Sequence, residues 1–419
     1  MSPGPIAERL PGAVRSLLQL GLSLAVILGV VLAVDRFDRL HENVVPRQVD
    51  PAWSTTTQVP AALGDSWVGD VVSDGTSIYL ATRESVVGFW GTIHVRRSLD
   101  GGISWLPSVL VSDPSPVSAR PGLGIAADGT LYVGYAVQGP RPATQSLVVR
   151  VSHDHGQSWT TPARVSLPAV GLIGVPVFLM AGALQLVAYT DGQLGVVYTQ
   201  RIASDGTPIG RPSMLGTTSH ELYSDAVFYD GLLALTALGT RGVAVWSGGN
   251  GRLRSAISDD AGQSWQPVGT LDQALVDRPR LATDGVTVLL AATDSGVGSR
   301  PTRRPFVRIW RSVDGGRTYQ RGPDVTDVAT VGWLDLGWGN GHWRLLYATC
   351  SGFLGCATPA RVWYTTSPDG DRWSDASVVS MAGNVRPLGV LSGRFGVTAI
   401  WGEVVATHQW RFWAARRDH

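Results

Sequence analysis

The chain has 419 residues, which is enough for one large fold or for two to three domains of ordinary size. Hydrophobic residues make up 44% of it, which excludes an intrinsically disordered chain and provides for a sizeable core. The 34 basic and 33 acidic side chains give a net charge of +1. No overall electrostatic signature therefore points to a nucleic-acid partner, and we predict none.

The first predicted element is an uncharged apolar stretch, residues 16–34, whose length suits a helix that crosses a bilayer once. We interpret it as an uncleaved transmembrane signal-anchor, with residues 1–15 in the cytoplasm; a cleaved signal peptide is the alternative. Both interpretations place everything after Asp35 outside the cytoplasm, either tethered to the cell membrane or secreted. Residues 35–51 then form a linker, and residues 52–419 form the domain that carries the function.

Five similar segments follow along the chain, so internal repetition is the strongest signal in this sequence. Four of them share the pattern Ser-x-Asp-x-Gly-x-x-aromatic, and the fifth is one residue shorter; they span 98–105, 152–159, 258–265, 312–319 and 367–373. Their starts are 54, 106, 54 and 55 positions apart, and a degenerate copy at 203–209 lies within the double gap. A period of this length is typical of a propeller blade.

Each repeat contains three apolar runs, the shared segment and a short fourth run, which predicts a four-stranded antiparallel blade. In the segment, glycine allows a positive φ, serine and aspartate bond the turn's own backbone, and the aromatic ring fills the seam between sheets. We assign this structural role to Ser98, Asp100, Gly102, Trp105, Ser152, Asp154, Gly156, Trp159, Ser258, Asp260, Gly262, Trp265, Ser312, Asp314, Gly316, Tyr319, Ser367, Asp369 and Trp373.

These segments resemble the Asp-box, or bacterial neuraminidase repeat, of the sialidase-like β-propellers. The resemblance covers roughly residues 53–419 and implies an all-β propeller with the boxes at its periphery, away from the central substrate site. Third strands ending near 98, 152, 203, 258, 312, 367 and 416 predict seven blades. Six blades, the number in the family's sialidases, is the alternative. Residues 53–59 match the fourth strand of the preceding repeats, so we expect them to complete the last blade and close the ring.

Three Arg-Pro pairs mark the best candidates for ligand binding: Arg120, Arg278 and Arg386 each precede a proline at the start of a first strand. First strands line the channel of a propeller, so these arginines could converge there. The resemblance implies a substrate carboxylate held by three arginines, because guanidinium forks suit a carboxylate. The family's Phe-Arg-Ile-Pro motif is missing, however. The alternative is an inherited Arg-Pro feature whose guanidinium bonds nearby loop carbonyls.

Candidates for catalysis are weaker. The resemblance implies a tyrosine nucleophile with a glutamate partner and an aspartate as acid and base; Glu221, Tyr223 and Asp225 offer these residue types, and Asp65 or Asp70 begins blade one. A solvated loop is the alternative for the group at 221–225. The basic segment 300–304 could meet an acidic partner, or it is a solvated loop. Neither zinc-ligand spacing nor a phosphate-binding loop occurs, so we expect no metal and no cofactor.

The two cysteines, Cys350 and Cys356, lie close in sequence between two strand-like runs. A disulfide across the base of that hairpin loop is sterically simple if they face each other, and it would persist only in an oxidising compartment. Two free buried thiols are the alternative.

The sequence favours a membrane-anchored, extracytoplasmic propeller that binds a protein or glycan partner without catalysis. The alternative is a sialidase-like exo-glycosidase that acts on acidic glycans, and a lyase or hydrolase built from other carboxylates is a third possibility. The sequence leaves the identity of the ligand and the oligomeric state open.

Overall fold

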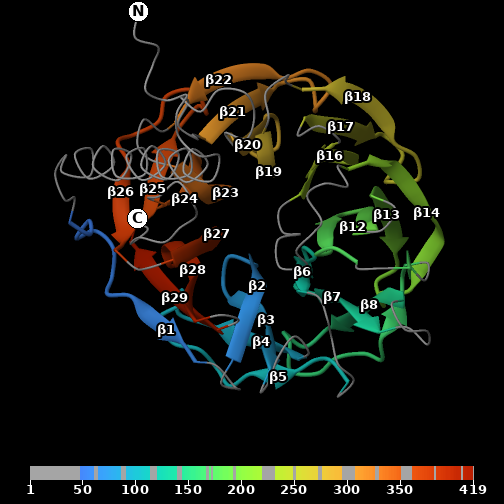
Figure 1. Ribbon diagram of the computed structural model, residues 1–419, viewed down its shortest axis with the longest axis horizontal. Coiled ribbons are helices and arrows are strands. Elements are labelled where there is room, and N and C mark those ends of the chain that lie inside the picture. Colours follow the sequence, from blue (N-terminus) through green and yellow to red (C-terminus); the bar gives the residue numbers. More distant parts are fainter. Residues whose placement is uncertain are drawn as a thin grey trace, which may run out of the picture.

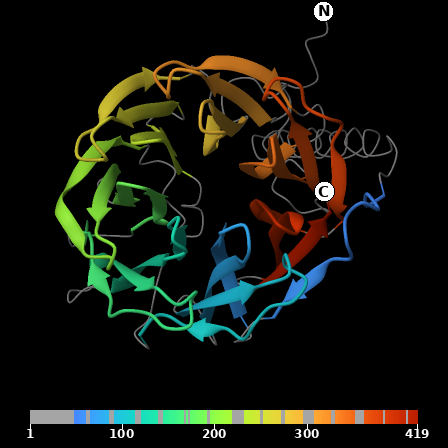
Figure 2. The ribbon, with the colours of Figure 1, turned by 180° about the vertical axis from the view of Figure 1, so that it is seen from behind.

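The computed structural model describes residues 48–60, 65–85, 91–113, 120–138, 144–166, 169–170, 173–191, 195–218, 232–248, 252–271, 276–294, 307–325, 330–350, 361–381, 384–406 and 409–418. The described strands form seven antiparallel blades arranged in a ring around a central axis (Figure 1), and the same ring is seen from behind in Figure 2. The all-β, seven-bladed prediction is confirmed, and the six-bladed alternative is wrong for this chain.

Blades are numbered in chain order, and each begins with its innermost strand. Blades one to three contain β2 (Asp65–Ser73), β3 (Ile78–Ser85), β4 (Thr92–Ser98) and β5 (Val109–Leu110); β6 (Gly122–Ile125), β7 (Leu131–Gln138), β8 (Thr144–Ser152), β9 (Ala163–Arg164) and β10 (Ala169–Val170); β11 (Val177–Ala181), β12 (Leu184–Asp191), β13 (Val196–Ile202) and β14 (Pro208–Thr217). Blades four to six contain β15 (Leu233–Leu238), β16 (Arg241–Ser247), β17 (Leu253–Ser258) and β18 (Gln266–Thr270); β19 (Val276–Thr283), β20 (Val288–Asp294), β21 (Val307–Ser312) and β22 (Gln320–Asp324); β23 (Thr330–Gly339), β24 (His342–Cys350), β25 (Arg361–Ser367) and β26 (Ser377–Ser380). Blade seven contains β27 (Asn384–Gly393), β28 (Gly396–Ala406), β29 (Gln409–Arg417) and β1 (Thr57–Val59).

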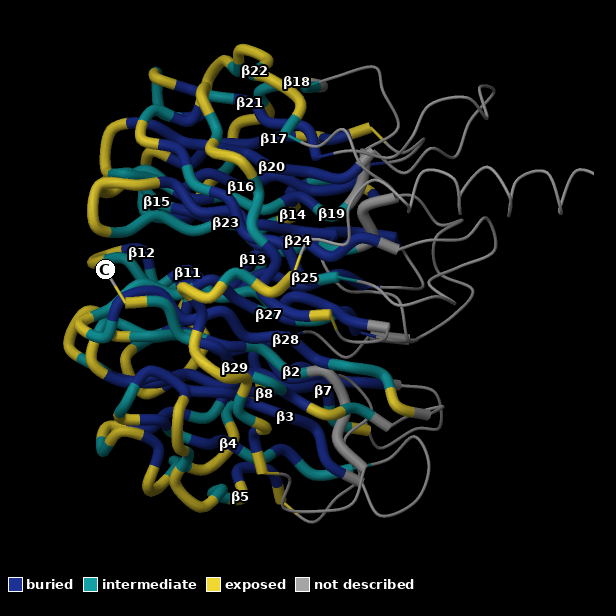
Figure 3. The backbone as a smooth tube through the Cα atoms, turned by 90° about the vertical axis from the view of Figure 1, so that its left-hand side faces the viewer, coloured by how far each residue is buried: buried dark blue, intermediate teal, exposed yellow. Residues whose placement is uncertain are grey.

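The hydrophobic core lies in the seams between neighbouring blades, and every one of the seven seams holds a buried apolar cluster. A sheet that is covered on both faces needs apolar residues at successive positions, not only at alternate ones. Residues 131–136 of β7 are accordingly all buried. Figure 3 shows these buried strands through the middle of the ring and the exposed residues mostly at its ends.

The five repeated segments form turns at the ends of third strands, and their bonds are local. In the first, Ser98 Oγ donates to Asp100 Oδ1 at 2.9 Å and accepts from Gly102 N at 2.8 Å, while Asp100 also accepts from Ser104 N. The same bonds recur around Asp154, Asp260 and Asp314. The serine and aspartate of these turns therefore bond groups of their own turn, as their pattern indicated.

The aromatic residue of each segment packs into the seam with the preceding blade. Trp159 of blade two contacts the cluster between blades one and two, and Trp265 of blade four contacts the cluster between blades three and four. The glycine before it is required on two counts. Gly262 has a φ of 79°, and an added Cβ would lie 2.7 Å from Leu186 Cδ2 of the preceding blade. The segment thus joins a local turn to the packing of two blades.

The degenerate copy at 203–209 keeps only part of this arrangement. Asp205 accepts from Thr207 N at 2.9 Å, and Gly206 has a φ of 84° beside Val149 and Val151 of blade two. The chain passes directly into β14, because the Ala203 and Thr207 backbones pair across a tight turn. The glycine contact is therefore the part of the motif that this blade preserves.

The two ends of the described chain meet in blade seven. Thr57, Gln58 and Val59 of β1 pair with Ala414, Trp413 and Phe412 of β29. Trp53 pairs with Arg417 and is buried in the seam between blades six and seven, where its ring meets Tyr364 edge-on at 5.1 Å. The outer strand of the last blade thus comes from the start of the propeller, and Figure 1 shows β1 beside β29.

Two further predictions fall outside the described residues. The apolar segment 16–34 is one, and within the described part of the chain no helix is long and apolar enough to span a membrane. The cysteine pair is the other: Cys350 is the last residue of β24, whereas Cys356 lies outside the described residues. The signal-anchor and the disulfide therefore remain predictions.

Candidate functional site at the mouth of the channel

Four inner strands carry a β-bulge near the end at which they begin, which we call the mouth of the channel. The bulges lie between Trp67 and Asp70 in β2, Asp277 and Arg280 in β19, Val331 and Trp333 in β23, and Pro387 and Gly389 in β27. A bulge re-aims the side chains beside it and interrupts the alternation of faces. In β19 the bulge holds Arg278 at a φ of 54°, beside a proline that has no N–H to give to the ladder. The fold thus departs from regular strands where candidate site residues lie.

The three arginines of the Arg-Pro pairs come from blades two, five and seven. Arg120 directly precedes Pro121 and β6 and is 8% exposed, Arg386 in β27 is 2% exposed, and Arg278 in β19 is half-buried. Burial, together with repulsion from Arg278 and Arg280, lowers the pKa of Arg120 to about 9. Burial and repulsion from Arg120 also hold the pKa of Arg386 well below its ordinary value. Arg120 is therefore close enough to both of the other arginines to repel them.

One more arginine adds to this group. Arg83, near the end of β3, is buried, and burial together with repulsion from Arg120 lowers its pKa to about 10. Positive charge from four blades is thus gathered at one mouth of the channel.

Trp333 of β23 lies between two of these arginines. The guanidinium carbon of Arg278 is 3.8 Å from the centroid of the indole ring, and that of Arg386 is 3.6 Å from it. Two guanidinium groups this close to one centroid must occupy opposite faces of the ring, because they would overlap on the same face. Stacking on an aromatic face stabilises a guanidinium and fixes its plane.

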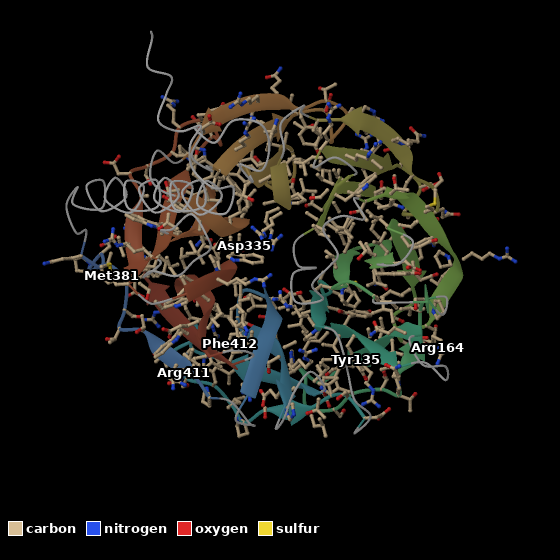
Figure 4. The ribbon with its side chains drawn as sticks, viewed as in Figure 1. Tyr135, Arg164, Asp335, Met381, Arg411 and Phe412 are labelled. Atoms are coloured by element: carbon tan, nitrogen blue, oxygen red, sulfur yellow. The ribbon has the colours of Figure 1, made fainter. Side chains whose placement is uncertain are left out.

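Below the arginines, Asp70, Arg280 and Asp335 line the channel. Asp70 accepts from Val71 N at 2.9 Å and from Leu123 N of blade two at 2.8 Å, and Asp335 accepts from Val390 N of blade seven at 2.9 Å. Arg280 Nε is 3.6 Å from Asp335 Oδ1. Figure 4 shows Asp335 toward the channel, whereas Arg164 and Met381 lie toward the rim.

The two aspartates hold protons more tightly than an exposed carboxylate. Burial raises the pKa of Asp70 to about 6, against the opposing effect of its two backbone donors and of Arg280, and repulsion from Asp335 adds to the rise. Burial also raises the pKa of Asp335, although Arg280 and the Val390 backbone bond oppose it. A carboxyl group with a pKa near 6 is partly protonated at neutral pH, so Asp70 can both give and take a proton.

These residues line a cavity of about 210 Å³ in the channel. Asp70, Arg280 and Asp335 are the charged residues of its lining, and aliphatic side chains of several blades form most of the rest, among them Val177, Leu233 and Leu388. An apolar cavity of roughly 150 Å³ holds benzene, so this one has room for a single six-membered ring. In the described part of the chain, no group of three side chains could hold a metal ion.

Several predicted residues cannot be placed. Glu221, Tyr223 and Asp225 lie outside the described residues, as does the basic segment 300–304, and of Asp65 only its backbone position at the start of β2 is described.

Sequence reasoning missed Trp333, Arg280 and Asp335. Arg280 is the second arginine of an Arg-Pro-Arg run, and Asp335 is the one charged residue within the otherwise apolar segment 331–338. Each of these two features could have marked its residue as a candidate from the sequence. Trp333 carried none, because it is one of 16 tryptophans.

No protein-family model matches the chain, and no curated protein matches it. It is similar in structure to a polysaccharide lyase, a PL25 ulvan lyase bound to -[GlcA(1-4)Rha3S]-, with a TM-score of 0.56 at 10% identity over 86% of this chain and 96% of that one. It is also similar to the endosialidase of phage phi92, with a TM-score of 0.50 at 10% identity over 90% and 71% of the chains. A Dyadobacter fermentans protein of unknown function matches with a TM-score of 0.50 at 15% identity over 88% and 100%. At such identities the likeness concerns the fold alone, which is that of a β-propeller.

Proposed function

We propose that this propeller binds a carboxylate-bearing glycan at the mouth of its channel. The observation that carries the proposal is the convergence of Arg120, Arg278 and Arg386 from three blades. Placing like charges together in a buried site is unfavourable, and a bound anion reduces that repulsion. Guanidinium forks pair with carboxylates through charge-assisted hydrogen bonds. The site is therefore best suited to an acidic group.

The structural neighbours favour a glycan over a protein as the ligand. One of them is bound to a saccharide that contains GlcA, and another is an endosialidase. The cavity below the arginines is lined by both charged and aliphatic side chains, which suits a sugar ring with hydroxyl groups on its edge and C–H groups on its faces. This supports the acidic-glycan alternative of the sequence analysis over a scaffold role.

Calorimetric titration of the purified full-length chain with a glucuronate-containing disaccharide tests this function. We expect the acid to bind at least tenfold more tightly than its carboxyl-reduced, neutral form, because each charge-assisted bond contributes about 1.5–3 kcal/mol. Arg278→Ala should abolish that preference. Arg394→Ala is the matched control, since Arg394 stacks on Phe395 in blade seven and contributes nothing to the site. Equal binding of the acidic and neutral forms, or no binding of either, would refute the proposal.

Cleavage of the glycan is a second candidate function, and the raised pKa of Asp70 favours it. Asp70 would protonate the leaving oxygen, and Asp335 is the second carboxylate in the same cavity. Asp70→Asn should then abolish product release, followed by mass spectrometry, while leaving disaccharide affinity within about threefold. Binding without turnover in the unmodified chain would leave recognition as the function.

We also propose that the site works outside the cytoplasm, tethered by residues 16–34, with Cys350 and Cys356 bonded. Alkylation of both thiols without reductant would contradict the bond. Recovery of the chain in the soluble cell fraction would contradict the tether.

A further inference from the structure

The indole of Trp333 separates two of the arginines at the mouth, and this spacing limits what they can bind. The guanidinium carbons of Arg278 and Arg386 lie 3.8 Å and 3.6 Å from the ring centroid on opposite faces, so they are on the order of 7 Å apart. The two oxygens of a carboxylate share one carbon atom. A carboxylate that formed two-bonded forks with both guanidinium groups would have to lie between them, within the volume that the indole occupies.

One carboxylate therefore cannot form such forks with Arg278 and Arg386 together. Arg120 lies within electrostatic range of both, so it can support either of them. The mouth consequently offers two anion positions, one on each side of the indole, with a shared positive charge beside them.

We propose that the site recognises two acidic groups on one glycan, one at Arg278 and the other at Arg386. The ligand class is a disaccharide unit in which a uronate and a second carboxylate or a sulfate belong to neighbouring sugars. Trp333 is the positioning residue that sets the distance between the two positions. This inference deepens the proposed function and rests on it.

The backbone holds both arginines in place for this task. Arg278 is fixed by a bulge and a positive φ in β19, and Arg386 directly precedes the bulge of β27. Trp333 itself follows the bulge of β23. Stacking removes rotamer freedom from two long side chains before the ligand arrives, which lowers the entropic cost of binding. A ligand whose acidic groups match the spacing gains from both positions at once.

Calorimetry with four probes tests the proposal: a disaccharide with one carboxylate and one sulfate on neighbouring sugars, its desulfated form, its carboxyl-reduced form, and the neutral parent. We expect the doubly acidic probe to bind the full-length chain at least tenfold more tightly than either singly acidic one. Arg278→Ala should remove the benefit of one acidic group, and Arg386→Ala should remove the benefit of the other.

Two outcomes would overturn the inference while leaving the proposed function intact. Singly acidic probes could bind within twofold of the doubly acidic one, or both arginine variants could lose the benefit of the same group. If no acidic probe binds more tightly than the neutral parent, the proposed function fails, and the inference fails with it.

Substitutions of Trp333 supply a test that does not require an arginine variant to fold. Trp333→Phe keeps a flat ring between the guanidinium groups, so the preference for two acids should persist within about threefold. Trp333→Leu removes the stacking surface, so that preference should fall to less than threefold while the singly acidic probes still bind. A Trp333→Leu chain that melts at the normal temperature and keeps the full preference would show that the indole does not set the spacing.

Discussion

The two ends of the propeller ring use the same residue types in opposite ways. At the end with the repeated turns, burial raises the pKa of Asp154, Asp260 and Asp314, but each accepts several bonds from residues two to four positions away. Together these bonds outweigh burial and lower the pKa of each to about 2. At the mouth, burial raises the pKa of Asp70 to about 6, and one of its two backbone donors, Leu123, comes from another blade. Local backbone donors stabilise a charge, whereas enclosure between blades penalises it.

The comparison also separates fold from function. The turns repeat because each blade needs the same closure, and the serine and aspartate side chains of each turn bond within that turn. The mouth is assembled once, from Arg120, Arg278 and Arg386, which are 158 and 108 positions apart in sequence. Repetition therefore marks the scaffold, and departures from it mark the site. The predictions below test that division.

Ring closure should give the largest effect, because blade seven has no repeated turn and is closed by β1 instead. Deletion of residues 1–60 removes β1 and Trp53, exposes the edge of β29 and opens the seam between blades six and seven. An unpaired edge strand promotes association with other chains. We expect this truncation to aggregate, as measured by size-exclusion chromatography with light scattering.

The matched control is deletion of residues 1–49, which keeps Asp50 and its ion pair with Arg417 at 2.9 Å. That truncation should elute as a folded species. If the two truncations behave alike, the ends of the chain do not close the ring.

The next largest effect is expected from a comparison of one variant in a repeated turn with one variant at the mouth, each measured for both stability and affinity. Asp260→Ala removes the acceptor for Ser258 Oγ and Ser264 N, and should lower the free energy of unfolding by about 1.5–3 kcal/mol without changing disaccharide affinity. Arg278→Ala should weaken affinity at least tenfold with little change in stability. Urea denaturation and calorimetry on both variants measure the four values. A loss of affinity in the Asp260 variant would break the division between scaffold and site.

The scaffold could be predicted from the sequence because its determinants are local. The serine, aspartate, glycine and aromatic positions of each turn lie within eight residues. The sequence distance between successive turns alone gives the blade period. Much of the mouth could not be predicted. The Arg-Pro pairs located three arginines at the starts of inner strands, but Trp333 meets Arg278 and Arg386 only through three bulges in three blades. Bulges shift the alternation of faces, so sequence spacing does not reveal such contacts.

The pH dependence of stability should have opposite signs at the two ends. The folded pKa of Asp70, about 6, exceeds that of an unfolded aspartate, so ionisation of Asp70 destabilises the fold as pH rises from about 4 to 6. The folded pKa of Asp260, about 2, lies below it, so its stabilising contribution is lost as pH falls from about 4 to 2. Burial lowers the pKa of His94, so the contribution of His94 to stability increases as pH rises toward neutral. This trend opposes that of Asp70.

Differences between matched chains isolate these two effects. Unfolding midpoints from pH 2 to 7 should converge for wild type and Asp260→Asn only below about pH 3. The Asp70→Asn chain should gain relative to wild type as pH rises through 6. Parallel curves for wild type and Asp70→Asn between pH 4 and 7 would show that the channel does not shift this carboxyl group.

The smallest expected effect concerns a backbone position inside the repeated turns. Ala261 has a φ of 58°, where the first and fourth turns carry Gly101 and Gly315. A left-handed conformation costs a residue with a Cβ roughly 1–2 kcal/mol, whereas glycine costs about 0.5–1 kcal/mol in chain entropy. The Ala261 methyl group also packs partly against its seam. Ala261→Gly should therefore raise the free energy of unfolding by only about 0.5 kcal/mol, measured by urea denaturation.

Two companion substitutions show whether backbone strain or side-chain contact decides if a glycine at this position of the turn raises or lowers the free energy of unfolding. The corresponding residue of the second turn, His155, also has a positive φ of 61°, but its Nδ1 lies 3.2 Å from Tyr79 Oη across the seam. His155→Gly should therefore destabilise the chain by about 0.5–1.5 kcal/mol, since the lost hydrogen bond outweighs the relief of strain. Gly101→Ala should destabilise it further, because the new Cβ would lie 2.9 Å from Phe395 Cβ of blade seven. Stabilisation by both glycine substitutions would mean that backbone strain alone sets the energetics of these turns, and that their contacts across the seams add nothing.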